Sequence, residues 1–128
     1  MALELNTLED RNNPLLSRRE VTAILRNAAG KVTRIDAAKQ IADRFNVDKN
    51  KVITITMTGQ RGTMDLRSTF YIYNSEDDMK KQLPRYMTLR GIPKADRKKL
   101  LDEEKAQRLK AKQAAAAKSG GSRSKAKR

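Results

Sequence analysis

Positive charge is concentrated at one end of this chain of 128 residues, and the same end has few large apolar side chains. Residues 1–92 hold 16 Lys and Arg against 11 Asp and Glu, a net of +5, whereas residues 93–128 hold 13 against 4, a net of +9. The large apolar residues of the second segment are Pro93, Leu100, Leu101 and Leu109. They are too few to bury a core. We therefore expect a globular body at 1–92 followed by a basic arm at 93–128.

Composition limits the body to one small domain and removes several classes of chemistry. Roughly 90 residues can bury one thin core, which fits a single sheet covered by one or two helices. The chain has no cysteine and no histidine, which excludes disulfides, zinc ribbons and the usual proton shuttle near neutral pH. No apolar run approaches the ~20 residues that cross a bilayer, and the first ten residues carry three acids, unlike a signal peptide. We expect a soluble, cytoplasmic protein without membrane contact.

Hydrophobic periodicity and capping residues predict the element order β-β-α-β-β-α for the body. This is an α+β domain with a small, mainly antiparallel four-stranded sheet and flanking helices. The strands are predicted at 2–8, 18–28, 52–60 and 66–73. Thr33 and Ser75 are predicted to cap two helices, the first ended by Asn46 in a left-handed conformation and the second by Pro84. A turn is expected at Asn12-Asn13-Pro14.

Apolar stripes in these elements predict which side chains form the core. The predicted core residues are Val21, Ala23 and Leu25 of the second strand, Ala38, Ile41, Ala42 and Phe45 of the first helix, Ile53, Ile55 and Met57 of the third strand, and Phe70 and Ile72 of the fourth. In the third strand, threonines alternate with the apolar residues, which predicts one core face and one threonine row.

The segment after Pro84 is predicted to contain a short extended piece at 86–90 and then a long helix. This helix runs from Lys94 to about Ala117, on the basis of its alanine, leucine, lysine and glutamate content. Its apolar stripe is thin, so we expect helix when the arm is docked and fraying when it is free. From Ser119 onward, serine, glycine and basic residues predict a flexible end.

No arrangement of residues predicts catalysis, a metal or a cofactor. The acids Glu76, Asp77 and Asp78 fall in a first helical turn, where the helix dipole explains them without a Mg²⁺ ion. The segment Gly30–Thr33 resembles a phosphate-binding loop only superficially, because the earlier glycine and the adjacent Lys-Ser/Thr pair are missing. Serine and threonine nucleophiles have no histidine base. We therefore predict no enzyme activity and no small-molecule substrate.

An RNA-recognition motif is an alternative that Tyr71 and Tyr73 suggest. That fold requires the order β-α-β-β-α-β, with stacking aromatic residues on its first and third strands. Here two strands precede the first helix, and the first strand has no aromatic residue. We expect both tyrosines to be covered by a helix or loop, in preference to stacking on bases.

Cations are the remaining functional signal. In the body they fall at turns and strand ends, from which a long side chain reaches a phosphate without the backbone entering a groove. Each of them alone is most often a solvated charge, whereas the arm is the strong case for nucleic-acid contact. The predicted RNA-binding residues are Arg18, Arg19, Lys49, Lys51, Arg61, Arg85 and Arg90 in the body and Lys94, Arg97, Lys98, Lys99, Arg108, Lys110 and Lys112 in the arm.

Three stretches of the body resemble a known family. They are Asn13-Pro14-Leu15-Leu16-Ser17-Arg18-Arg19-Glu20-Val21, then Ile72-Tyr73-Asn74-Ser75, then Pro84-Arg85-Tyr86 with Arg90-Gly91. In order and spacing they resemble the small-subunit ribosomal protein numbered twenty-four of archaea and eukaryotes, over about residues 2–92. The resemblance implies a four-stranded antiparallel sheet, a lysine-rich C-terminal extension, and ribosomal RNA of the small subunit as the partner. It also implies positions near RNA for Arg18, Arg61, Arg85 and Arg90.

The chain departs from the family pattern at the hairpin 59–65. Family members usually carry an aromatic-Gly pair there, whereas Arg61 precedes Gly62 in this chain. Ser68 stands where family members usually have glycine. Phe70 stands where they usually have glycine or alanine. The segment between Tyr86 and Gly91 is one residue shorter than the same segment in family members. These departures leave the domain assignment intact and concern how the hairpin tip meets RNA.

Together these features predict a non-enzymatic structural constituent of the small ribosomal subunit, which stabilises folded ribosomal RNA through phosphate contacts with little base readout. Neighbouring ribosomal proteins are a second class of partner. A DNA-binding or chromatin- or transcription-associated basic protein is the main alternative, against which the resemblance and the lack of a helix-turn-helix pattern argue. A phosphate-handling enzyme is a further alternative, disfavoured by the lack of His, Cys and a phosphate loop.

Overall fold

A computed structural model describes residues 4–123 of the chain. Its elements are β1 (Leu5–Asn13), β2 (Arg18–Leu25), α1 (Arg34–Phe45), the 3-10 helix η1 (Lys49–Lys51), β3 (Val52–Gly59), β4 (Leu66–Tyr73), α2 (Glu76–Gln82), α3 (Arg85–Leu89) and α4 (Lys94–Arg123). The chain forms two compact units, Met1–Gly91 and Ile92–Arg128. Within residues 4–123, no helix has the length and apolar character that crossing a bilayer requires.

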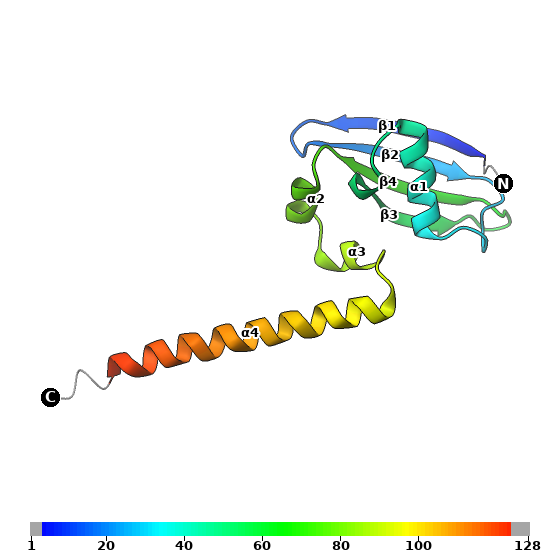
Figure 1. The fold of residues 1–128 in the computed structure, drawn as a ribbon. Coiled ribbons are helices and arrows are strands. Elements are labelled where there is room, and N and C mark those ends of the chain that lie inside the picture. Colours follow the sequence, from blue (N-terminus) through cyan, green and yellow to red (C-terminus); the bar gives the residue numbers. More distant parts are fainter. Residues whose placement is uncertain (1–3, 124–128) are drawn as a thin grey trace. The chain divides into compact units, whose positions relative to one another are not determined.

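The sheet has the strand order β1-β2-β4-β3, with every neighbouring pair antiparallel. Two hairpins, β1–β2 and β3–β4, meet along β2 and β4, and α1 lies across one face of the sheet (Figure 1). The α+β prediction is therefore confirmed. The first hairpin is longer than predicted, because Asn12 and Asn13 pair with Arg19 and Arg18 instead of forming the turn. The turn follows them, and its start is capped by Asn13 Oδ1, which accepts from the Leu16 backbone N–H at 3.3 Å.

Helix α1 begins and ends where its capping residues predict. The Thr33 side chain accepts a hydrogen bond from the backbone N–H of Asp36 at 3.3 Å. Asn46 ends the helix in the left-handed conformation, with φ 51° and ψ 47°. Ser75 caps α2 in the same way, accepting from the Asp78 backbone N–H at 3.2 Å. Both predicted caps are confirmed because each satisfies a backbone donor that the first helical turn leaves free.

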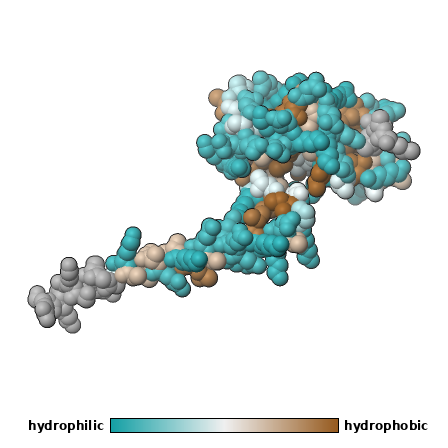
Figure 2. Space-filling model, viewed as in Figure 1, coloured by the Kyte–Doolittle hydropathy of each residue, from teal (hydrophilic) through white to brown (hydrophobic). Residues whose placement is uncertain are grey.

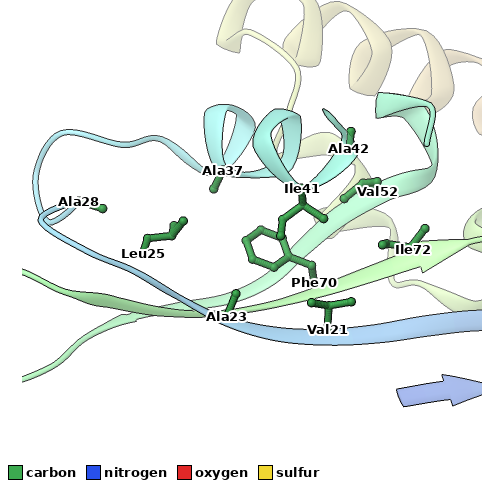
Figure 3. Close-up of a cluster of buried hydrophobic side chains, with 10 residues drawn as sticks. All are labelled: Val21, Ala23, Leu25, Ala28, Ala37, Ile41, Ala42, Val52, Phe70 and Ile72. Atoms are coloured by element: carbon green, nitrogen blue, oxygen red, sulfur yellow. The ribbon is translucent and has the colours of Figure 1, made fainter. Parts of the chain in front are cut away.

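The core lies between α1 and the sheet. Figure 3 shows Ile41 pointing from α1 toward the ring of Phe70 on β4, and both side chains are fully buried. Small residues on the helix allow this close approach. The buried apolar residues of this cluster are Val21, Ala23, Leu25, Ala28, Ala37, Ile41, Ala42, Val52, Phe70 and Ile72. Ala38, Phe45 and Met57, which were also predicted, are partly buried and pack against the cluster.

The predicted core face of β3 is wrong for Ile53 and Ile55. Ile53 pairs with Tyr71, on the face away from α1, while Thr54 pairs with Phe70 and is buried. Thr54 Oγ1 donates to the Arg34 carbonyl at 3.0 Å, which satisfies its hydroxyl inside the core. A register shift between Thr54 and Thr56 then returns Met57 to the core face. A bulge inserts one residue and so changes the phase of the alternation, which a strict period of two does not anticipate.

The segment after α2 also differs from prediction. Residues 86–90 were predicted to be extended, yet Arg85–Leu89 form α3, and the Pro84 carbonyl accepts from the Met87 N–H at 3.0 Å. A proline ends one helix but its fixed φ also suits the start of the next. Helix α4 continues to Arg123, beyond the end predicted near Ala117, so the flexible end predicted from Ser119 is wrong as far as Arg123. The rest of that end, 124–128, lies outside the described residues.

Candidate nucleic-acid interface

Helix α4 displays most of its side chains to solvent from Lys94 to Ser119. From Lys94 to Ser119 every residue is exposed except Arg97 and Glu104, which are half-buried. Even Leu109 is 60% exposed. Hydrophilic residues predominate along the visible side of this helix (Figure 2). The predicted arm cations are therefore accessible, and Arg97 alone among them is also used internally, because its guanidinium donates to the Ile92 carbonyl at 3.1 Å.

In the body, Arg18 has a set of internal partners. Its guanidinium donates to Glu20 at 2.8 Å and to the Tyr73 hydroxyl at 3.3 Å, and it lies 4.0 Å from the centre of the Tyr71 ring. Burial opposes its charge, but the hydrogen bonds to Tyr73 and Glu20 outweigh this, so the pKa of Arg18 is raised. The side chain thus stabilises the sheet face opposite α1. Its predicted contact with RNA requires it to share these donors.

Arg19 points to the other face of the sheet and is paired as well. Its guanidinium forms a two-pronged hydrogen bond with the Asp10 carboxylate and lies 4.6 Å from the centre of the Phe45 ring. The hydrogen bond from Arg19 lowers the pKa of Asp10 and raises the pKa of Arg19. The Arg19 side chain is 45% exposed, so its outer edge remains open to solvent.

Lys49 and Lys51 lie in η1, in an acidic neighbourhood. Lys51 is half-buried and its ammonium group is 3.4 Å from the Asp48 carboxylate. A surface depression beside Lys49 is lined by Asp43, Val47, Asp48, Lys49, Asn50 and Glu76. This lining holds three carboxylates and one cation, and the repulsion from the carboxylates opposes a phosphate at this place.

Of the other predicted body cations, Arg61 lies far from Arg18, Arg19, Lys49 and Lys51. Arg61 is exposed in the loop between β3 and β4. The start of β2 and the start of β3 meet at the opposite end of the sheet, because Arg18 pairs with Tyr73 and Val52 with Ile72. Eight-residue strands separate the two ends by roughly 25 Å. Arg90, after α3, lies 5.0 Å from the centre of the Tyr86 ring, and Arg85 is exposed. The structure does not bring the body cations into one patch.

The tyrosines of β4 are engaged inside the body. The Tyr73 side chain is 1% exposed, which confirms the prediction that other parts of the body cover it. Tyr71 is half-buried, and the Arg18 guanidinium covers its ring. The two rings meet edge to face, with centres 6.5 Å apart. Neither ring offers a free stacking platform of the kind that single-stranded RNA uses.

Two cations of the arm that the sequence-based prediction omitted are equally accessible. Lys105 and Lys118 are both exposed on α4. The signal for Lys105 was available in the sequence, because it lies inside the predicted helix, whereas Lys118 lies just beyond the predicted end near Ala117. Helical spacing places Lys105 on the same side as Lys98 and Lys112, with seven residues to each. Ser68 and Phe70, which depart from the family pattern, both point into the core and away from any surface that RNA can reach.

Comparison with known proteins agrees with the motif resemblance. The sequence pattern of a family described as Ribosomal protein S24e matches residues 3–91. A protein of Methanopyrus kandleri (strain AV19), described as "Small ribosomal subunit protein eS24", is 28% identical to the chain over 102 residues. The aligned region covers 79% of this chain and 83% of that protein. The family match lies on the body, with the sheet and α1 inside it.

Proposed function

Because the chain belongs to the ribosomal protein S24e family, we propose that it is a structural constituent of the small ribosomal subunit and stabilises ribosomal RNA there through phosphate contacts. The observation that carries the RNA contact is the exposed helix α4. Residues 93–128 hold a net charge of +9, and from Lys94 to Ser119 the helix buries no side chain fully. A helix that adds nothing to a core and carries this charge is suited to a polyanion, since each neutralised phosphate releases condensed counterions.

The contacts are proposed to be with the RNA backbone and to involve little reading of bases. The arm contains no Phe, Tyr or Trp to stack on a base. In the body, Tyr73 is buried, Tyr71 is covered by Arg18, and the Arg90 guanidinium lies 5.0 Å from the centre of the exposed Tyr86 ring. The cations that remain accessible are lysines and arginines, which position a protein on phosphates without carrying sequence information.

The place of action proposed for the chain is the ribosome in the cytoplasm, with ribosomal RNA as the main partner and neighbouring ribosomal proteins as further partners. We propose no catalytic role. The first turn of α2 holds the carboxylates Glu76, Asp77 and Asp78, whose negative charges interact favourably with the helix dipole. Asp78 also accepts a hydrogen bond from the Ser75 hydroxyl and so completes the cap. The presence of these acidic residues is thus explained by their contribution to the stability of α2.

Sedimentation of a cell lysate tests this function directly. A tagged full-length chain is expressed in its host, and the lysate is run through a sucrose gradient at moderate salt, with and without prior treatment with DNase. We expect the chain to migrate with the small ribosomal subunit. A chain that stays at the top of the gradient, or that leaves the pellet only when DNA is digested, supports a DNA-associated protein instead and contradicts the proposal.

A further inference from the structure

The charges of α4 are distributed unevenly around its axis. Between Lys94 and Ser119 the helix holds nine cations and four acids. At about 100° per residue, six of the cations and none of the acids fall within an arc of about 100°. The six are Lys94, Arg97, Lys98, Lys105, Arg108 and Lys112, and we call them the basic stripe. The other three cations share the rest of the circumference with all four acids, a net of −1.

The stripe is exposed and extended. Its four lysines and Arg108 are exposed, and only Arg97 is half-buried. At 1.5 Å per residue, Lys94 and Lys112 are separated by about 27 Å along the axis. A long, stiff ligand suits contacts that are confined to one side of a helix over such a length. A flexible strand can also reach cations on the other sides of the helix.

We propose that the arm binds double-helical RNA through the basic stripe alone. Lys99 and Lys110, which were predicted from the sequence to bind RNA, then face away from the RNA, as does Lys118. This proposal rests on the proposed function, which supplies RNA as the polyanion. The duplex is favoured because its phosphates form stiff, regular rows, whereas proteins bind single strands chiefly by stacking bases on aromatic residues, which the arm lacks. Alanines at Ala115 and Ala116 lie on the same side and leave room for close approach.

Two matched triple variants of the full-length chain test the stripe. One is Lys98→Gln with Lys105→Gln and Lys112→Gln; the other is Lys99→Gln with Lys110→Gln and Lys118→Gln. Both remove three charges from the same helix, and Lys and Gln have similar helix propensities. Binding is measured by fluorescence anisotropy, at several salt concentrations, to a synthetic RNA hairpin with a long stem and to an unpaired RNA strand of equal length. Circular dichroism checks that helical content is unchanged.

The stripe variant is expected to lose about 100-fold in affinity for the hairpin at 0.1 M salt, and its salt slope should fall by about 2–3 units for three lost phosphate contacts. The other variant should stay within about fivefold of the unaltered chain, because salt screens charges that face away from the ligand. The unaltered chain should prefer the hairpin to the unpaired strand. Equal losses in the two variants, or equal binding of the two RNAs, overturn the proposal.

A second pair of variants adds charge, so that loss of folding cannot explain the result. Ala115→Lys with Ala116→Lys extends the stripe, whereas Ala114→Lys with Ala117→Lys places the same charges on the other side. Only the first pair should tighten binding to the hairpin. If the unaltered chain binds RNA and migrates with the small subunit while both pairs act alike, the stripe is wrong and the proposed function stands. If the unaltered chain binds no RNA, both fail.

Discussion

Two helices show how differently the body and the arm are encoded. Helix α1 has 12 residues, a capping side chain at its start, a left-handed Asn46 at its end, and Ala37, Ile41 and Ala42 buried against the sheet. Helix α4 has 30 residues, and its most apolar positions, such as Leu109, remain exposed. The first is helical because it covers a core, and the second because its composition favours a helix.

The two helices therefore depend on different features of the sequence. Spacing of apolar residues specifies how the body folds, and we propose that spacing of charges specifies what the arm contacts. Substitutions in the two regions should therefore change different measured quantities. Body substitutions should alter the free energy of unfolding, and arm substitutions should alter RNA affinity and its salt dependence.

The largest effect on stability is expected for Phe70→Ala. Phe70 is fully buried under Ile41, so truncation removes apolar contacts and leaves a cavity, which costs about 3–5 kcal/mol of unfolding free energy. Urea unfolding followed by circular dichroism measures it. The control is Leu109→Ala on α4, which should leave the unfolding of the body unchanged. A similar loss in both variants would mean that the arm is part of the folded core.

A smaller effect is expected at the end of α1. Asn46 has φ 51°, a conformation that an alanine side chain disfavours and that asparagine and glycine tolerate. Asn46→Ala should lower the unfolding free energy by about 1 kcal/mol, while Asn46→Gly should leave it nearly unchanged. Urea unfolding of both variants distinguishes a backbone requirement from a requirement for the amide. Equal losses in the two variants would point to the amide.

The smallest effect concerns the ion pair between Asp10 and Arg19. The hydrogen bond from Arg19 lowers the pKa of Asp10 in the folded chain. Its contribution is therefore present above the unfolded pKa of about 3.9 and is lost as pH falls through the lower folded pKa. The pair is partly exposed, so solvent screening limits this contribution to less than about 1 kcal/mol.

Asp10→Asn measures this contribution. The unfolding free energies of the variant and the unaltered chain should differ at pH 7, begin to converge near pH 4, and meet only below the lowered folded pKa of Asp10, where the group is neutral in both folded and unfolded states. Urea unfolding at several pH values follows the convergence. A difference that stays constant down to pH 3 would show that the carboxylate charge is not responsible.

Sequence patterns predicted the elements whose ends are set by local residues. Thr33, Asn46 and Ser75 satisfy or terminate backbone hydrogen bonds within a few residues of themselves, so their roles are visible in the sequence. The face of β3 was not visible in the same way. The bulge near Ile55 depends on how β3 pairs with β4, which is a contact between strands and leaves no mark on the alternation itself.

The sequence predicted that the candidate interface is rich in cations, but it did not predict where each cation lies in the fold. The charge of the arm is plain from the sequence, but fourteen candidate cations could not be ranked until the structure placed them. Arg18 and Arg19 proved to have partners within the sheet. On α4, helical spacing puts Lys105 on the same side as Lys98 and Lys112, a grouping that the predicted helix already contained.

The most direct test of the central claim compares the full chain with residues 1–92 in the salt dependence of binding to ribosomal RNA. If roughly half of the arm's 13 cations contact phosphates, removing the arm should reduce the slope of log K against log[salt] by about 4–6 units. Urea unfolding of the fragment should match that of the body in the full chain. An unchanged slope would contradict the claim, because the few dispersed arginines of the body would then carry all the binding.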